Sequence, residues 1–145
     1  MKRIAIFSIV FIISAMIARA QDWQTDFEAA KAIAAKENRE IIMVFQGSDW
    51  CAPCIKLDQE IWSSDEFKTY AKDHFVMLKV DFPRKKANAL APEQQKKNNK
   101  LAESYNKKGF FPFVVVLDAQ GNKRGETGYK KMAPNEYITH LLSFK

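Results

Sequence analysis

The sequence predicts an α/β fold in which a mixed central sheet carries helices on both faces. Apolar, β-rich runs at 41–45, 75–82 and 113–117 alternate with stretches of helical periodicity. The run at 41–45 is apolar at every position, as expected for a parallel strand covered by helices on both sides. A turn at 118–122 then joins 113–117 to a returning strand at 123–127, which adds an antiparallel hairpin to the parallel strands.

An extra helix is expected before the first strand. Thr25 and Glu28 form a capping box, and apolar residues behind it recur at helical spacing, which predicts a helix over 26–36. After the strand, apolar positions predict a second helix from near Cys51 to Trp62. A second capping box at 63–66 then opens a short third helix.

Two further helices complete the predicted order. One is expected from Pro92 to Asn106, because proline suits the first turn of a helix, with Gly109 after its end. The other begins at Pro134 and closes the chain. No internal repeat or flexible linker interrupts this order, so residues 21–145 are expected to form one domain.

The first twenty residues have the features of a signal peptide. Lys2 and Arg3 precede an apolar run over 4–18, and Ala18-Arg19-Ala20 supplies small residues at signal peptidase spacing. The apolar run is shorter than the about 20 residues that span a bilayer, although an uncleaved anchor is the alternative. We expect cleavage after Ala20 and a mature protein that is soluble, exported to a bacterial periplasm and without stable membrane association.

Composition and charge exclude several classes of protein. With 47% hydrophobic and 28% charged residues, the chain is globular rather than disordered or fibrous. Residues 21–145 carry 20 basic and 17 acidic side chains, and 83–108 alone carries a net charge of +6. That segment lacks the interleaved aromatic residues of a base-stacking site. We therefore expect a solvated basic helix face there and no nucleic-acid partner.

The two cysteines lie where the apolar strand gives way to a helix, in the sequence Trp50-Cys51-Ala52-Pro53-Cys54. A thiolate is the reactive form of cysteine, and the N–H groups at a helix N-terminus stabilise it at Cys51. Cys54 follows one turn later, close enough to attack a mixed disulfide. Proline is tolerated in a first helical turn, so Pro53 fits this placement. The pattern favours thiol redox chemistry.

Two other uses of the cysteine pair remain open. A structural disulfide is possible, although closing so short a loop stabilises a fold little. Half of a zinc site is also possible, with His74 and His140 as further ligands, although they are far apart in sequence. Redox chemistry would need neither a metal nor a cofactor, and we expect none.

The cysteine motif together with Gly109-Phe110-Phe111-Pro112 and the strand 113–117 resembles the thioredoxin superfamily. The likeness spans 23–144 and is greatest to small exported thioredoxin-like proteins with a helix before the first core strand. It implies a thioredoxin-like three-layer fold, with Cys51 as the attacking thiol, Cys54 as the resolving thiol and a cis peptide bond before Pro112, facing the cysteines. The residues expected to bind substrate are Trp50, Ala52, Pro53, Phe111 and Pro112.

The chain departs from the thioredoxin pattern at two positions. Thioredoxins usually carry a buried acid six residues before the first cysteine, where this chain has Phe45. Glu60, Asp81 or a water molecule are the candidate substitutes, whereas Asp49 is expected to be a solvated loop carboxylate. Ile55 stands where many thioredoxins have a lysine.

These observations predict a thiol-disulfide oxidoreductase that reduces protein disulfides. Strong oxidants of the superfamily place a histidine between the cysteines, whereas Ala52 and Pro53 supply no ionisable group, which predicts a comparatively reducing couple. Its expected partners are protein thiols and disulfides and an electron donor that the sequence does not identify, and a monomer is expected. The alternative is a non-catalytic thioredoxin-like binding module with a passive or metal-holding cysteine pair.

Overall fold

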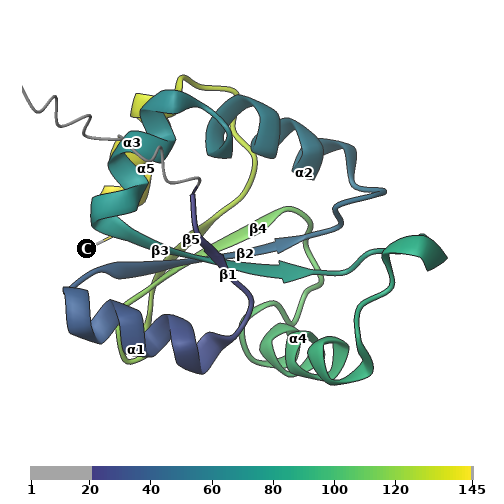
Figure 1. Ribbon diagram of the computed structural model, residues 1–145. Helices are drawn as coiled ribbons and strands as arrows, with labels where there is room; N and C mark the ends of the chain where they lie inside the picture. Colours follow the sequence, from purple (N-terminus) through teal and green to yellow (C-terminus); the bar gives the residue numbers. More distant parts are fainter. Residues whose placement is uncertain (1–20, 145) are drawn as a thin grey trace, which may run out of the picture.

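The computed structural model describes residues 21–144, which form three layers around a five-stranded mixed sheet (Figure 1). The strand order is β1-β3-β2-β4-β5. β1, β2 and β3 run parallel, whereas β4 lies antiparallel to β2 and β5 lies antiparallel to β4. The strands are β1 (Trp23–Gln24), β2 (Glu40–Gln46), β3 (Phe75–Asp81), β4 (Phe113–Leu117) and β5 (Lys123–Thr127). The predicted mixed sheet is confirmed.

Helices cover both faces of the sheet. On one face lie α2 (Ala52–Leu57), α3 (Asp65–His74) and α5 (Pro134–Leu142); on the other lie α1 (Phe27–Glu37) and α4 (Pro92–Tyr105) (Figure 1). The side chains of β2 alternate between the two resulting cores, with Ile42 and Val44 in one and Ile41, Met43 and Phe45 in the other. Burial on both faces is why this strand is apolar throughout.

Two features of the helices and strands were not predicted. β1 pairs with β3 in parallel, with Trp23 opposite Met77, but a two-residue strand has no periodicity to reveal it in the sequence. The helix after the cysteines changes character at Asp58, because Asp58–Trp62 forms a π-helical turn that continues α2.

Both predicted capping boxes are displaced by one residue. Asp26, not Thr25, caps α1 and accepts a hydrogen bond from the N–H of Ala29 (2.9 Å). Ser64, not Ser63, caps α3. Ser63 still has the helical backbone of the preceding π-helical turn, which it ends, whereas Ser64 has the extended backbone of an N-cap residue. Each box contains two adjacent residues able to cap, and the pattern alone does not choose between them.

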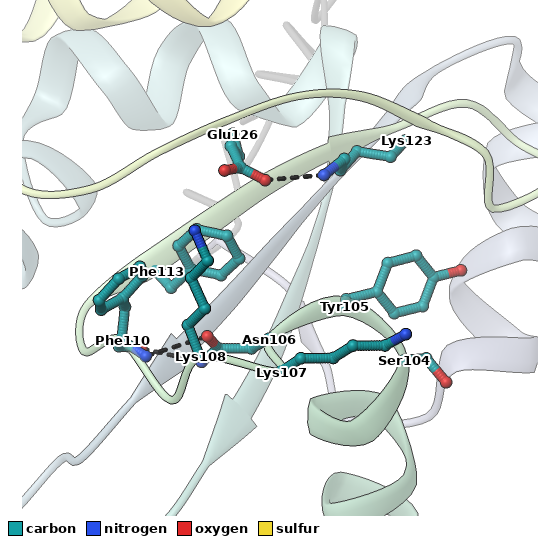
Figure 2. A pocket seen from close by; sticks show the side chains of 9 residues that line it. All are labelled: Ser104, Tyr105, Asn106, Lys107, Lys108, Phe110, Phe113, Lys123 and Glu126. Atoms are coloured by element: carbon teal, nitrogen blue, oxygen red, sulfur yellow. Dashed lines mark hydrogen bonds and ion pairs between the residues drawn. The ribbon is translucent and has the colours of Figure 1, made fainter.

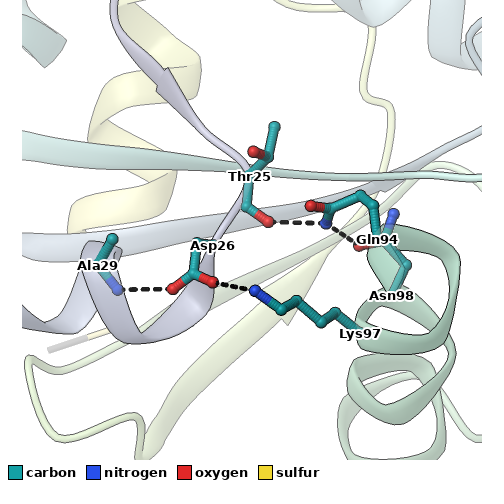
Figure 3. A network of polar contacts seen from close by, with 6 residues as sticks. All are labelled: Thr25, Asp26, Ala29, Gln94, Lys97 and Asn98. Atoms are coloured by element: carbon teal, nitrogen blue, oxygen red, sulfur yellow. Dashed lines mark hydrogen bonds and ion pairs between the residues drawn. The ribbon is translucent and has the colours of Figure 1, made fainter. Parts of the chain in front are cut away.

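The lysine-rich helix α4 is attached to the rest of the domain by polar side chains (Figure 3). Lys97 Nζ lies 2.6 Å from Asp26 Oδ2, and Gln94 Nε2 donates to the Thr25 carbonyl (2.9 Å). Buried Asn98 donates to the carbonyl of Asp81 (2.9 Å), at the end of β3. The helix therefore has a mostly exposed basic face, as expected, but Lys97 forms an ion pair rather than remaining fully solvated.

The predicted signal peptide, residues 1–20, lies outside the described residues. Within 21–144, none of the helices combines the length and the apolar character that a bilayer span requires.

Candidate active site

The cysteine pair and the proline loop, which is residues 110–112, meet at one edge of the sheet. Beyond β2 the chain turns back at Gly47, whose carbonyl accepts the N–H of Cys51 (2.9 Å), and α2 then begins at Ala52. β4 runs antiparallel to β2, with Phe113 opposite Phe45. The residue before β4, Pro112, therefore lies at the same edge at which β2 ends. The fold thus brings together two motifs that are far apart in the sequence.

Cys51 and Cys54 form a disulfide, with their Cα atoms 5.2 Å apart. Cys51 is the N-cap residue of α2, and its Sγ accepts a hydrogen bond from the N–H of Cys54 (3.3 Å). In a reduced protein this N–H, together with the helix dipole, stabilises negative charge on Cys51. The predicted placement of Cys51 at a helix start is confirmed.

The disulfide is largely buried. Cys51 is 4% exposed and Cys54 is 5% exposed, although the attacking role expected of Cys51 requires a sulfur that incoming chains can reach. The Cys51 sulfur caps the first turn of α2, so part of its surface lies against the helix. Ala52 and Pro53, between the cysteines, are exposed. The disulfide therefore lies directly beneath an exposed strip of surface.

The proline loop has the geometry that the resemblance implies. The Phe111–Pro112 peptide bond is cis, and Pro112 is buried. The Asn106 side chain, itself buried, accepts from the N–H of Phe110 (3.0 Å) and donates to its carbonyl (2.9 Å) (Figure 2). Gly109, with φ of +68°, makes the turn that leads into this loop. Asn106 and Gly109 thereby fix the approach to Pro112.

Trp50 is fixed on several sides. Its indole N–H donates to the carbonyl of Phe82 (2.7 Å), and its ring lies 5.4 Å from that of Phe111 in an edge-to-face contact. The guanidinium of Arg84 stacks over the indole, with Cζ 3.6 Å from the ring centre. Trp50, one of the residues expected to bind substrate, is therefore half-buried, and a cation covers part of its ring.

Asp49 is a loop carboxylate at the surface, as the sequence suggested, but it is also hydrogen-bonded to a distant segment. Its two oxygens accept hydrogen bonds from the N–H of Arg84 (2.9 Å), the N–H of Lys85 (2.9 Å) and the amide of Asn88 (3.0 Å). These hydrogen bonds, led by that from Arg84, hold the pKa of Asp49 below its usual value. Asp49 thus attaches the 84–88 segment to the turn that carries the cysteines.

The position of the usual thioredoxin acid is apolar in space as well as in sequence. Phe45 is fully buried and packs against Phe113, with ring centres 6.1 Å apart. The two candidate substitutes are used elsewhere: Glu60 accepts from the Tyr129 hydroxyl (2.7 Å), and Asp81 accepts from the Ser48 hydroxyl (2.6 Å). Both carboxylates therefore have hydrogen-bond partners other than Cys54, and neither lines the cavity beside it.

A different acid lies beside Cys54. A cavity of about 220 Å³ is lined by Cys54, Asp58, Lys79 and four further residues: Gln46, Ser48, Ile55 and Gln59. The N–H of Asp58 bonds to the carbonyl of Cys54, one helical turn back. Sequence analysis missed Asp58, although the four-residue spacing after Cys54 on a predicted helix would have identified it.

The two histidines of the zinc hypothesis have other contacts. His74 Nδ1 lies 2.8 Å from the carbonyl of Tyr70, and His140 Nε2 lies 2.9 Å from the Thr127 hydroxyl. Over residues 21–144, His, Cys, Asp and Glu side chains nowhere form a group of three or more suited to a metal ion. The structure therefore offers the zinc hypothesis no ligand set within that range.

Sequence analysis also missed two apolar side chains that flank the cysteines and Pro112. Phe110 is 54% exposed and Ile55 is 39% exposed, and they are the exposed large hydrophobic residues of the described chain. Phe110 directly precedes Phe111 and Pro112, and Ile55 directly follows Cys54. Exposed apolar residues beside a reactive group commonly mark a binding surface.

Comparison with known proteins agrees with the fold. A family model described as thioredoxin-like matches residues 22–119. The protein named "Disulfide bond reductase DsbH" from Chlamydia pneumoniae is 36% identical over 121 residues, which cover 83% of this chain and 70% of that protein.

Solved structures give the same result. One named "DsbH Oxidoreductase" superimposes with a TM-score of 0.80 at 31% identity, covering 94% of this chain and 92% of that one. A thioredoxin from Thermus thermophilus, with a TM-score of 0.61 at 17% identity over 83% of this chain and 84% of its own, shares the fold. This chain therefore belongs to the thioredoxin-like family and is a homologue of the oxidoreductase DsbH.

Proposed function

We propose that the protein is an exported thiol-disulfide oxidoreductase that reduces disulfide bonds in other proteins through Cys51 and Cys54. The observation that carries this proposal is the Cys51–Cys54 disulfide at the start of α2, at the sheet edge where cis-Pro112 also lies. The homologue named a disulfide bond reductase supports the same direction of electron flow. So does the absence of an ionisable residue between the two cysteines.

The reaction is a dithiol exchange in two steps. The Cys51 thiolate attacks one sulfur of the substrate disulfide, which breaks that bond, forms a mixed disulfide and releases the other substrate sulfur as a thiolate. The Cys54 thiolate then attacks Cys51 Sγ and releases the second substrate thiol. The substrate gains two electrons and two protons, and the enzyme is left with the Cys51–Cys54 disulfide. An external dithiol donor returns the enzyme to its reduced form.

The carboxylate of Asp58 is the base best placed to take the proton of the Cys54 thiol. A buried thiol resists ionisation, and the apolar Phe45 gives it no help. Asp58 shares the cavity beside Cys54 with Lys79. Proton transfer there is direct or through a water molecule in the cavity. This role replaces that expected of Glu60 or Asp81.

Substrate chains bind along the surface that covers the disulfide. By its resemblance to thioredoxins, the backbone of Phe111 pairs with the substrate chain next to Pro112. Ala52 and Pro53 border the disulfide, and exposed Phe110 supplies apolar contact on the proline side. Trp50 supports this surface from below, because its own ring is half-buried.

Export follows from residues 1–20, which have the composition of a cleaved signal peptide. A periplasmic location fits a reductase of exported proteins. N-terminal sequencing of the protein recovered from a periplasmic fraction tests both points, and the expected first residue is Gln21.

Insulin reduction tests the activity. With dithiothreitol as the donor, the protein should accelerate precipitation of the insulin B chain, and the Cys51→Ser variant should show only the uncatalysed rate. A passive binding module would give no acceleration with either protein. Metal analysis of the purified protein, run in parallel, distinguishes a metal-holding cysteine pair.

A further inference from the structure

Three consecutive cations, the first of them stacked on Trp50, form no ion pair within residues 21–144. Arg84, Lys85 and Lys86 are exposed, and the ion pairs found among residues 21–144 include none of them. Asp49, which is hydrogen-bonded to this segment, accepts with its two oxygens from the backbone N–H groups of Arg84 and Lys85 and from the Asn88 amide. Asp49 therefore fixes the backbone of this segment and leaves the cationic side chains available.

One of these cations, Arg84, is held in place by its side chain, and the backbone of the other two is ordered by hydrogen bonds and a turn. The Arg84 guanidinium lies 3.6 Å from the centre of the Trp50 ring, and Trp50 directly precedes Cys51. A short 3₁₀ turn, Lys86–Asn88, follows at once. A charged group that is already in place costs little conformational entropy when a partner binds.

A second group of cations lies on the proline side. Lys107 and Lys108 follow α4, are exposed, and form no ion pair among residues 21–144. Lys108 Nζ lies 6.0 Å from the ring centre of exposed Phe110. Both lysines line a cavity of about 370 Å³ that also contacts Phe110 (Figure 2). Cations thus adjoin both Trp50 and the proline loop.

We propose that this enzyme selects protein disulfides whose flanking sequence is acidic, an inference that rests on the reductase function proposed above. Residues 83–108 carry a net charge of +6, whereas the rest of 21–145 carries −3, and five of the cations in that segment are the exposed Arg84, Lys85, Lys86, Lys107 and Lys108. Cations grouped in this way attract acidic chains and repel basic ones. Single-stranded nucleic acid fits less well, because it stacks successive bases on several aromatic faces. Here Arg84 covers Trp50, and Phe110 is the one exposed Phe, Tyr or Trp side chain among residues 21–144.

The test uses three fluorogenic disulfide peptides that share one core and differ in their flanks: acidic, neutral or basic. At low ionic strength, kcat/KM for the acidic peptide should exceed that for the neutral one by about tenfold. The ratio should fall toward one in about 0.5 M salt, because salt screens exposed charges. The basic peptide should be the poorest of the three.

Charge-removing variants locate the effect. In Arg84→Gln/Lys85→Gln/Lys86→Gln the acidic-to-neutral ratio should fall toward one. The variant Lys85→Gln/Lys86→Gln leaves Arg84 on Trp50. Its acidic-to-neutral ratio of kcat/KM should lie between that of the wild type and that of the three-residue variant. The matched control is Lys36→Gln/Lys68→Gln/Lys72→Gln, which removes the same charge from α1 and α3, helices that end where β2 and β3 begin, away from the cysteines. It should keep the wild-type ratio.

The outcomes separate the two proposals. If the wild-type protein reduces all three peptides equally, the acidic preference is wrong and the reductase function stands. If it reduces none of them, both proposals fail. If the three-residue variant abolishes binding to phosphatidylglycerol vesicles while the wild type shows no peptide preference, the surface recognises anionic lipid and the proposed substrate class is wrong.

Discussion

The guanidinium of Arg84 lies 3.6 Å from the centre of the Trp50 ring. Trp50 directly precedes Cys51, the first cysteine of the disulfide. Trp50 is fixed in turn by its hydrogen bond to Phe82 and by close packing against Gly47. The residue before a reactive cysteine therefore acts here as a support for a cation. The stability of this arrangement and the chemistry of the cysteines can be tested separately.

Gly47→Ala should destabilise the protein. A Cβ atom at this position overlaps the indole of Trp50, so the ring must move and its 2.7 Å hydrogen bond to Phe82 must break. We expect a loss of about 1–3 kcal/mol in the free energy of unfolding, measured by urea denaturation.

Gly109→Ala is the matched control for that loss. Its Cβ meets nothing within 4 Å, and only its positive φ of +68° is unfavourable, which costs about 1–2 kcal/mol. Gly109→Ala should preserve the chemical shift of the Trp50 indole N–H, whereas Gly47→Ala should change it. An unchanged Trp50 resonance in Gly47→Ala would contradict the packing described here.

Acid should release the segment that Asp49 fixes. The pKa of Asp49 is depressed in the folded protein, first by the N–H of Arg84 and next by the Asn88 amide. A depressed carboxyl pKa stabilises the fold above the unfolded-state value, about 4, and this contribution is lost as the pH falls through the folded-state value. Amide exchange at Arg84 and Lys85 should therefore show added opening below pH 4.

Asp49→Asn provides the comparison for this pH dependence. It removes the charge but retains one acceptor oxygen, so both amides should be less protected at pH 7 and should show no added opening in acid. If the wild-type protein and Asp49→Asn open in parallel as the pH falls, another group controls the segment.

Asp58→Asn should slow the resolving step. If Asp58 takes the Cys54 proton, the mixed disulfide on Cys51 should accumulate, and its resolution should slow by about 100-fold near pH 7. The slowing should diminish at high pH, where the Cys54 thiol ionises without help. Rapid acid quench followed by mass spectrometry measures the intermediate.

Glu60→Gln is the control for Asp58→Asn. Glu60 also follows the cysteines but accepts a hydrogen bond from Tyr129 (2.7 Å), so its variant should resolve at the wild-type rate. Equal slowing in both variants would show that the resolving step depends on negative charge near α2 and not on a proton acceptor beside Cys54.

Asn98→Ala should cost more stability than Asn99→Ala. Asn98 is 2% exposed and bonds both Gln94 and the carbonyl of Asp81 (2.8 and 2.9 Å), so its loss leaves buried polar groups unpaired, at about 1–3 kcal/mol. Asn99 is exposed and bonds only Gln95 (2.9 Å) among the described residues. Thermal unfolding of the two variants measures the difference, and equal losses would contradict the role of Asn98 in attaching α4.

The sequence predicted the parts of the fold that depend on local patterns. Continuous apolar runs located β2 and β4, and 113–117 and 123–127 match β4 and β5 in full. The W-C-A-P-C motif and the proline loop identified the family, which the comparisons confirm. Neighbouring capping residues misplaced two helix starts by one residue, because either residue satisfies the pattern.

The surroundings of the cysteines depend on contacts that no local pattern records. Asp49 accepts its hydrogen bonds from residues that lie 35–39 positions later in the chain. The cover of Arg84 on Trp50 and the burial of Cys51 depend in the same way on how loops from different strands meet. Asp58 is the exception, because its spacing from Cys54 was visible in the sequence and was not used.

Covalent trapping tests the central claim most directly. The Cys54→Ser variant, reduced and then mixed with a disulfide peptide, should form a stable mixed disulfide, and peptide mapping by mass spectrometry should place it on Cys51. Failure of the variant to form any adduct, under conditions in which the wild-type protein stays folded and reduced, would contradict dithiol exchange through this pair.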